Sequence, residues 1–313
     1  MEPKQEEEEE EEEAAAEAAA EERRKKQKRD DMNEPKPDTT REAEAETETE
    51  TSNSDTRRHF VLVHGPCHGG WVWYKLATLL RSAGHRVSAI DLAGCGVDLA
   101  RIEDLHTFDE HVAPLMEAMA SIPEDEKIVA VGHCFGGYAL SLAMERFPKR
   151  IAAAVFATAL MPKQWTSPAS TLDEFFQRDH IESLMDCQLS FDQDRENPLA
   201  SYTYGPKFMA TIMYNCCPPE DATLATLLAR PSGLYLEDIS NETMLSGENY
   251  GSVARVYIIS KQDKLYTEDY QRWIIETNPP KEVKEIEGSD HMLMLSKPQD
   301  LCNCLLEIAE TYV

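Results

Sequence analysis

Cys134 is the residue of this chain with the most direct chemical implication, because it stands at the centre of the hexapeptide Gly-His-Cys-Phe-Gly-Gly at 132–137. The apolar run 127–131 before it is typical of a buried strand, and residues 138–147 after it are typical of a helix. A strand, a tight turn of the form G-x-nucleophile-x-G and a helix raise the central side chain above the carboxyl end of a parallel sheet. Cysteine is also a common core residue, so a buried structural thiol is the alternative interpretation. The complete strand–turn–helix context favours a reaction centre.

Two further residues supply the partners that a nucleophile needs for acyl transfer. Asp263 comes three residues after an apolar strand at 256–260, and His291 follows a strand at 282–286. Such chemistry requires a base that takes the proton of the nucleophile and an acid that orients the base. The chain order of cysteine, aspartate and histidine fits, with each residue on a loop behind its own strand. Asp290 is the rival acid because it precedes His291, but neighbouring side chains tend to diverge, so Asp263 is preferred.

Three other histidines are expected near Cys134, Asp263 and His291. We interpret His64 and His133 as structural, the latter as part of the turn itself. His68 is a candidate for the mouth of a substrate pocket.

Strands and helices alternate along most of residues 58–313 and predict an α/β fold with a mostly parallel central sheet and helices on both faces. From about 161 to 251 the alternation is lost, and aromatic residues and prolines interleave with short helical pieces. This stretch is too long for a loop, so we expect an inserted helical cap over the carboxyl edge of the sheet. The expected strands are 59–63, 86–90, 127–131, 151–156, 254–260 and 281–286, and the expected helices are 71–83, 107–119, 138–147, 268–276 and 299–312.

Residues 1–57 differ in composition from the rest of the chain. They contain eight consecutive glutamates at 6–13, and their 22 acidic and 10 basic residues give a net charge of −12 out of −27 for the whole chain. Without aromatic residues such a segment cannot bury enough apolar surface to fold, so we expect a disordered acidic tail. The tail is either a silent solvated extension, which we prefer, or an interaction segment.

The bulk composition excludes several classes of protein. No apolar run reaches 18 residues, and the N-terminus lacks the features of a secretory signal or a transit peptide. The eight cysteines show no metal-binding spacing, so we expect no metal, and reduced thiols in a cytoplasmic protein. The acidic balance argues against nucleic acid as a partner, and the lack of an apolar span argues against a membrane.

Residues 58–313 resemble the plant methylesterase and hydroxynitrile lyase family of α/β-hydrolases, which includes the salicylate-binding methylesterases. The resemblance implies hydrolysis of small methyl esters, such as those of salicylate, jasmonate or indole-acetate, without a cofactor. It also implies an apolar pocket under the cap, a small-molecule ester or aromatic acid as ligand, and a homodimer. The segments that carry the resemblance are HFVLVHGPCHGGWVWYKL, GHRVSAIDLAGCGVD, HTFDEH, VGHCFGGYALSLAMERFP, YGPKF, RVYIISKQD, EDYQRWI and GSDHMLMLSKP.

The resemblance also assigns roles at the reaction centre. The serine nucleophile of the family falls on Cys134, its acid on Asp263 and its base on His291. One oxyanion donor falls on the backbone N–H of Phe135, and the second falls on Pro66, which has no N–H. The chain therefore departs from its family twice: a cysteine replaces the serine, and one oxyanion donor is missing.

Two positions separate an esterase from a lyase within this family. The lyase branch has a threonine after the first-loop histidine and a lysine after the catalytic histidine, where this chain has Gly65 and Met292. A methionine cannot hold cyanide, so the esterase is preferred. Apolar pocket contacts are expected from Phe135 and from Leu160, Met292, Trp165 and Phe175.

Three hypotheses follow. The preferred one is a methylesterase-type hydrolase that works slowly through Cys134, His291 and Asp263. The alternative is a catalytically degenerate ligand-binding homologue that keeps the pocket for a small aromatic acid. A minor alternative is a lyase of the hydroxynitrile type, or another elimination or cyclisation, in which the oxyanion donors matter less.

Overall fold

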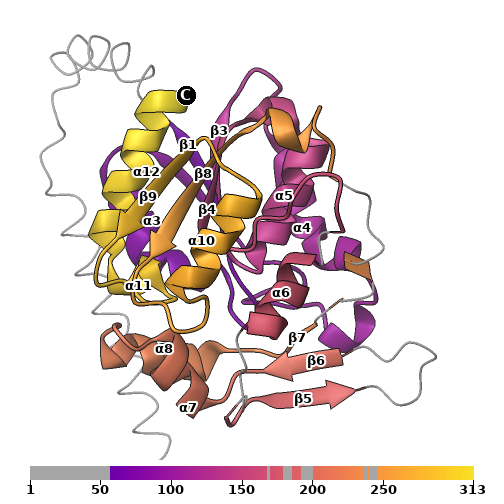
Figure 1. The fold of residues 1–313 in the computed structure, drawn as a ribbon, viewed down its shortest axis with the longest axis vertical. Helices are drawn as coiled ribbons and strands as arrows, with labels where there is room; N and C mark the ends of the chain where they lie inside the picture. The colour runs from indigo at the N-terminus through magenta and orange to yellow at the C-terminus, as the bar shows by residue number, and fades with distance from the viewer. Residues whose placement is uncertain are drawn as a thin grey trace, which may run out of the picture. The chain divides into compact units, whose positions relative to one another are not determined.

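A six-stranded sheet runs through the centre of the protein in this computed structural model, and all five of its strand pairings are parallel (Figure 1). The order across the sheet is β2-β1-β3-β4-β8-β9, so that β3 and β4 are central. The strands are β1 (His59–Val63), β2 (Arg86–Ile90), β3 (Ile128–Cys134), β4 (Ile151–Ala159), β8 (Ala254–Ser260) and β9 (Glu282–Ile286). The parallel α/β architecture expected from the sequence is confirmed.

The structure describes residues 57–167, 170–178, 185–191, 200–233, 235, 238–239 and 245–313. The segment 1–57, for which we expected disorder, lies outside the described residues except for Arg57. Residues 57–313 form one compact unit.

Helices cover both faces of the central sheet. Figure 1 shows α3 and α12 on one face and α4, α5 and α10 on the other. The helices outside the cap are α3 (Tyr74–Ser82), α4 (Phe108–Ser121), α5 (Gly136–Arg146), α10 (Glu268–Thr277), α11 (Leu293–Ser296) and α12 (Pro298–Tyr312), with short 3-10 turns η1 (Gly70–Trp73), η2 (Ile102–Asp104), η3 (Pro148–Arg150) and η5 (Tyr250–Ser252). Helix α4 begins with a capping box, in which the Thr107 side chain accepts from the Glu110 N–H and the Glu110 carboxylate accepts from the Thr107 N–H.

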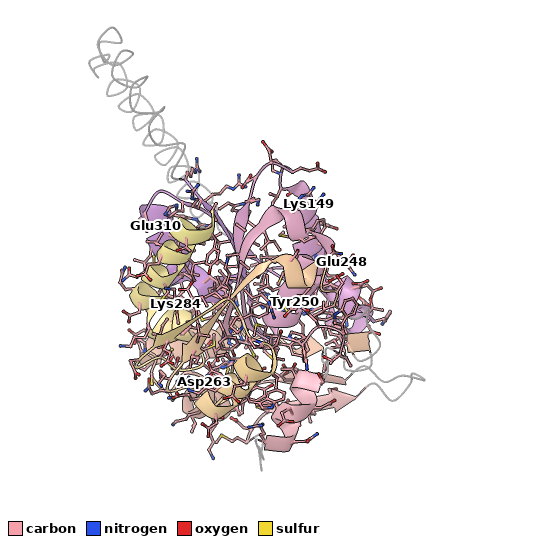
Figure 2. All side chains as sticks on the ribbon, turned by 45° about the horizontal axis from the view of Figure 1, so that its top comes forward. Lys149, Glu248, Tyr250, Asp263, Lys284 and Glu310 are labelled. Carbon is pink, nitrogen blue, oxygen red and sulfur yellow. The ribbon has the colours of Figure 1, made fainter. Side chains whose placement is uncertain are left out.

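Strand β3, which carries Cys134, and its neighbour β1 are buried along their whole length. Every residue of β1 and of β3 is buried, as expected for parallel strands covered by helices on both faces. Figure 2 shows the contrast with the periphery, where Lys149 and Glu310 reach solvent while Tyr250 and Asp263 lie inside. Cys134 is therefore the last residue of a fully buried central strand.

The segment between β4 and β8 forms the expected cap, but the cap is not purely helical. It contains α6 (Ser170–Arg178), α7 (Pro206–Phe208), a π-helical turn η4 (Met209–Met213) and α8 (Pro219–Leu228). It also contains an antiparallel sheet of β5 (Gln188–Phe191), β6 (Ala200–Thr203) and β7 (Ser232–Gly233), drawn below the central sheet in Figure 1. These strands have two to four residues, which is too short for a periodic sequence signal.

Hydrogen bonds fix both ends of the cap to the core. Where the chain leaves β4, the carbonyl of Pro162 accepts from the Tyr250 hydroxyl at 2.8 Å and from the Asn278 amide at 2.6 Å. Where the chain returns, the Glu145 carboxylate on α5 accepts from the backbone N–H and the hydroxyl of Ser246, at 2.9 and 2.8 Å.

None of the helices in the described part of the chain combines the length and the apolar character that a membrane span requires.

Candidate active site

Cys134 ends the central strand β3 in a strained backbone conformation. Its φ is +55°, in the left-handed region that residues with a side chain rarely adopt, and helix α5 begins two residues later. A Cβ at Gly136 would lie 2.5 Å from the carbonyl oxygen of His64, so the first turn of α5 can approach the first loop only with glycine there. This is the geometry of the turn that the sequence predicts. It holds the thiol at the floor of the cavity described below.

His291 and Asp263 form a buried pair next to this thiol. The Nδ1 atom of His291 lies 2.8 Å from Oδ2 of Asp263, and neither side chain is exposed to solvent. Because a carboxylate only accepts, Nδ1 carries the proton and Nε2 is left as the acceptor. Among the described residues, Nε2 of His291 is a buried nitrogen without a hydrogen-bond partner. The imidazole is thus oriented as a base with a free acceptor atom.

The charges around His291 favour its protonated form. Burial alone lowers the pKa of His291, but the Asp263 carboxylate and the Cys134 sulfur outweigh burial and raise it well above its usual value. The Tyr266 side chain contacts both groups, because its hydroxyl lies 3.6 Å from the Cys134 sulfur and its ring lies edge-on to the His291 ring with centroids 5.1 Å apart. The thiol and the imidazole therefore lie in the same corner of the site. A proton that leaves the thiol therefore has a prepared acceptor.

Three donors besides His291 hold the Asp263 carboxylate in place. Its Oδ2 accepts from the Thr158 hydroxyl at 2.6 Å, and its Oδ1 accepts from the N–H groups of Leu265 and Tyr266 at 2.7 and 2.9 Å. Thr158 itself has a φ of +39°, which is unfavourable for a β-branched residue and indicates local strain. The sequence interpretation missed Thr158, because nothing in the chain order connects the end of β4 with the acid.

Asp290, the rival acid, is bound elsewhere. Its carboxylate accepts from the N–H of Cys216 at 2.7 Å and from the N–H of Met292 at 3.0 Å, and the Cys217 thiol lies 3.6 Å away. Burial raises the pKa of Asp290. The carboxylate faces the cap rather than the imidazole, so Asp263 is the partner of His291.

The two histidines expected to be structural are both bound to backbone. The His64 ring donates from Nδ1 to the carbonyl of Gly65 at 2.7 Å and accepts at Nε2 from Leu92 at 3.1 Å. The His133 ring donates from Nε2 to the carbonyl of His291 at 2.8 Å. Burial lowers the pKa of both rings, so each remains neutral.

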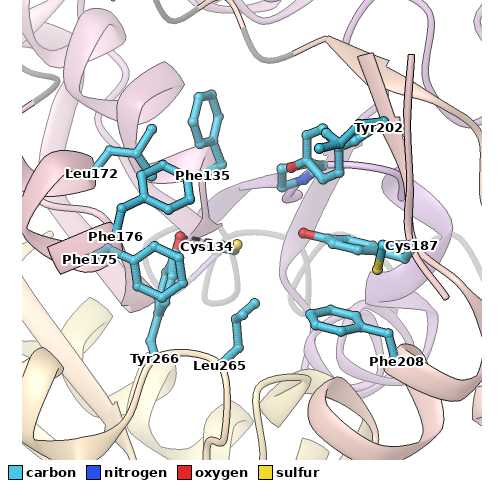
Figure 3. Close-up of a pocket in the computed structure, with 13 residues that line it drawn as sticks. Cys134, Phe135, Leu172, Phe175, Phe176, Cys187, Tyr202, Phe208, Leu265 and Tyr266 are labelled. Carbon is cyan, nitrogen blue, oxygen red and sulfur yellow. Dashed lines mark hydrogen bonds between the residues drawn. The ribbon is translucent and has the colours of Figure 1, made fainter. Parts of the chain in front are cut away.

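An apolar cavity of about 190 Å³ opens above the thiol (Figure 3). Its lining residues come from the first loop, the turn, the cap and the loop after Asp263, and none of them is charged. They are Pro66, Cys134, Phe135, Leu172, Phe175, Phe176, Cys187, Leu189, Tyr202, Tyr204, Phe208, Leu265 and Tyr266. The cavity suits a small neutral ligand with an apolar body.

Several residues expected from the sequence meet at this cavity. Cys134, Phe135 and Pro66 line it together, as does Phe175 from the cap. The carbonyl of Cys134 also accepts from the N–H of Leu160 at 3.0 Å, which braces the turn from below.

Four residues proposed for substrate binding are not among those that line the cavity within the described chain. The His68 ring bridges the Pro66 carbonyl and the Tyr214 hydroxyl at 2.6 and 2.7 Å, and burial lowers its pKa to about 3. Leu160 and Met292 are fully buried, and Trp165 is 60% exposed. Besides the expected Phe135 and Phe175, the aromatic lining includes residues that the sequence interpretation did not name, because the sequence does not reveal the direction of their side chains. They are Phe176, Tyr202, Tyr204, Phe208 and Tyr266.

The comparisons with known proteins agree with this geometry. The sequence profile of the alpha/beta hydrolase family matches residues 60–303. The chain belongs to the alpha/beta hydrolase family. The chain is 49% identical over 255 residues to salicylic acid-binding protein 2 of Nicotiana tabacum, an alignment that covers 82% of this chain and 98% of the relative. It is 48% identical over 256 residues to methyl jasmonate esterase 1 of Vitis vinifera, with coverage of 82% and 98%.

A solved structure also matches this chain in fold and sequence. The crystal structure of polyneuridine aldehyde esterase superposes on this hydrolase with a TM-score of 0.79 at 45% identity, covering 81% of this chain and 99% of the other. Relatives named as esterases therefore share almost their whole length with the hydrolase, which supports a hydrolase of the carboxylesterase type.

Proposed function

We propose that the protein hydrolyses small methyl esters of neutral, apolar acids, of the salicylate, jasmonate or indole-acetate type, and that Cys134 is the nucleophile in the position of the family's serine. The observation that carries the proposal is the arrangement of the thiol at the cavity floor beside an imidazole that a buried carboxylate orients. The uncharged lining supports a neutral acyl group.

The proposed reaction begins with transfer of the thiol proton of Cys134 to Nε2 of His291. The sulfur electron pair then forms a bond to the ester carbonyl carbon, and the carbonyl electrons move onto oxygen. Collapse of this adduct breaks the bond to the alkoxide, which takes the proton from His291 and leaves as methanol. His291 next takes a proton from water, and the resulting hydroxide forms a bond to the carbonyl carbon of the thioester. The bond between that carbon and sulfur then breaks, the acid is released, and the sulfur regains its proton from His291.

The oxyanion needs donors in this scheme. The N–H of Phe135 stands before the first turn of α5, where backbone donors have no partner inside the helix. Pro66 supplies no second N–H, and the loss of one such donor costs about 3 kcal/mol of transition-state stabilisation. We therefore expect slow turnover unless another group donates.

A matched set of esters tests the proposal. We expect the full chain to hydrolyse at least one of methyl salicylate, methyl jasmonate and methyl indole-acetate, with methanol and the acid formed in equal amounts. Monomethyl succinate, whose acyl group is charged, should not react. Loss of activity in Cys134→Ala is required, and equal rates for wild type and Cys134→Ala contradict the proposal.

The missing donor at Pro66 also favours a second candidate, a binding protein that holds a small aromatic acid without reaction. In that case the ligand binds wild type and Cys134→Ala equally and no ester is consumed.

A lyase of the hydroxynitrile type is disfavoured, because a Cβ at Gly65 would lie 2.8 Å from the Cβ of Cys134, which leaves no room for a threonine. Met292 is fully buried and offers no charge for an anion.

A further inference from the structure

The hydroxyl of Tyr266 lies at the reaction centre, where the sequence interpretation placed no side-chain donor. It is 3.6 Å from the sulfur of Cys134, and the residue lines the cavity. Figure 3 shows the Tyr266 hydroxyl directed at the sulfur. Within the described part of the chain, the thiol is the only hydrogen-bond partner of this hydroxyl. A phenol that is 3% exposed and has one partner, a reacting atom, is placed for chemistry.

The position of Tyr266 is fixed from several sides. Its N–H donates to Oδ1 of Asp263 at 2.9 Å, and its carbonyl accepts from the Gln271 amide at 2.6 Å. Its ring packs edge-on against the rings of His291 and Phe175, with centroids 5.1 and 5.2 Å apart. The Asp263 carboxylate therefore orients the base with one oxygen and the backbone of Tyr266 with the other.

The hydrogen-bond roles at this contact change as the reaction proceeds. In the resting state the thiol donates to the phenol oxygen. Once the proton has moved to His291, the sulfur can only accept, so the phenol must donate. Burial raises the pKa of the Tyr266 hydroxyl, which keeps it protonated and able to donate.

We propose that the Tyr266 hydroxyl is the second oxyanion donor of this hydrolase and replaces the N–H that Pro66 cannot supply. When the sulfur bonds to the carbonyl carbon, the negative charge moves from sulfur to an oxygen about 3 Å away, within reach of a donor that already contacts the sulfur. The hydroxyl donates a hydrogen bond and keeps its proton. The inference rests on the proposed role of Cys134.

Other candidates for this donor are less well placed. The N–H groups of Cys67 and His68 follow Pro66, but neither residue is among the described residues that line the cavity. Tyr204 does line it, yet its ring pairs with those of Tyr202 and Phe208 in the cap, both with centroids 5.3 Å apart.

A double-mutant cycle on the full chain tests the inference. Acylation by p-nitrophenyl acetate is followed by rapid mixing in wild type, Tyr266→Phe, Pro66→Ala and the double variant. We expect Tyr266→Phe to lower the acylation rate roughly 100-fold with little change in KM. In the Pro66→Ala background, where an N–H is restored, we expect the same change to cost less than about 10-fold. Equal losses in both backgrounds, or no loss in Tyr266→Phe, overturn the inference.

Alkylation of Cys134 by iodoacetamide separates stabilisation of the oxyanion from an effect on the sulfur alone, because alkylation forms no oxyanion. We expect the alkylation rate of Tyr266→Phe to stay within about 10-fold of wild type while acylation falls roughly 100-fold. A parallel fall in both rates overturns the inference, as does a larger acylation loss in Tyr204→Phe.

Tyr250→Phe removes a buried hydroxyl that bonds to the Pro162 carbonyl and serves as the fold control, with an unchanged rate. If wild type acylates no faster than Cys134→Ala, the proposed function itself fails, a result distinct from wild-type rates in Tyr266→Phe.

Discussion

At the scale of single residues, the Asp263 carboxylate has the most hydrogen bonds in the proposed site, because its two oxygens receive four of them. Its Oδ2 accepts from the His291 imidazole and the Thr158 hydroxyl. Its Oδ1 accepts from the backbone N–H groups of Leu265 and Tyr266. A buried carboxylate that loses one of its donors keeps the cost of burial without the compensating hydrogen bond. Changes at the donors should therefore affect both stability and rate.

Thr158→Val removes one donor while keeping a β-branched side chain at the same strained position. We expect the free energy of unfolding to fall by about 1 to 3 kcal/mol, because a hydrogen bond to a buried charge is lost. We expect the ester hydrolysis rate to fall roughly tenfold, since the acid orients His291 less firmly. Denaturant unfolding and steady-state kinetics measure the two effects. Thr158→Ser keeps a hydroxyl and should recover most of both, whereas an equal loss in Thr158→Ser assigns the effect to packing.

The pH dependence of thioester hydrolysis reports on His291. The imidazole must be neutral to take a proton from water, and the Asp263 charge raises its pKa in spite of burial. The fraction of neutral imidazole then still increases above pH 7, where an ordinary histidine is already deprotonated. We expect the hydrolysis rate of the acylated protein to keep rising between about pH 7 and 9. Asp263→Asn removes the charge and should shift the rise to lower pH, and a rate that is level from pH 6 upward contradicts this account.

The proximity of Cys134, Asp263 and His291, the proposed catalytic set, could be predicted from the sequence, because each member follows its own apolar strand in the expected chain order. Thr158 and Tyr266 could not, because their contacts with Asp263 and Cys134 join residues 105 and 132 positions apart. A single sequence carries no signal for such a contact. Trp165, one of the apolar cap residues expected in the pocket, is 60% exposed.

At the scale of elements, the cap is fastened to the core by a polar cluster between α3 and α8. The buried carboxylate of Asp221 on α8 accepts from the Tyr74 hydroxyl at 2.8 Å and from the Lys75 ammonium at 2.5 Å. The Asp221 side chain is 1% exposed and that of Lys75 25%, so water screens the pair only in part. These contacts join a helix of the cap to a helix of the core.

Asp221→Ala should loosen the cap. We expect the free energy of unfolding to fall by about 1 to 3 kcal/mol, because two donors lose their buried acceptor. Thermal and denaturant unfolding measure the change. Glu174→Gln breaks the more exposed pair of Glu174 with Arg178 and should change stability by less than about 0.5 kcal/mol. If the two substitutions lower the free energy of unfolding equally, the buried contacts between α3 and α8 contribute no more to stability than an exposed ion pair.

The elements of the core were predictable to within a few residues, and those of the cap were not. Strands β1, β2 and β8 begin and end where the sequence indicated, since each is a compact, mostly apolar run between turn residues. Strand β4 continues to Ala159, three residues beyond the predicted end. The strands of the cap pair with one another rather than with the core sheet, and they are too short to show alternation.

At the scale of the whole molecule, the family fold accounts for residues 58–313 and leaves the first 57 residues outside it. The alignment with salicylic acid-binding protein 2 uses 82% of this chain yet spans 98% of that relative. A relative of the same fold thus has no counterpart for most of this acidic segment.

Removal of residues 1–56 should leave the fold and the chemistry unchanged. We expect the same midpoint of thermal unfolding within about 2 °C, since a segment of this acidic composition has little apolar surface that it could bury. We also expect the same rate of ester hydrolysis, measured beside the full chain. A loss of activity on truncation would assign the acidic segment a role at the site.

The central claim is that Cys134 forms a covalent bond to the acyl group. The most direct measurement is rapid mixing with p-nitrophenyl acetate followed by intact-protein and peptide mass spectrometry, on wild type, Cys134→Ser and Cys134→Ala in parallel. The account predicts an acetyl thioester on residue 134 of the wild type that forms faster than it disappears, and no adduct in Cys134→Ala. An unmodified wild type without turnover, together with activity in Cys134→Ser, would contradict the account and identify a family scaffold that is inactive at its nucleophile.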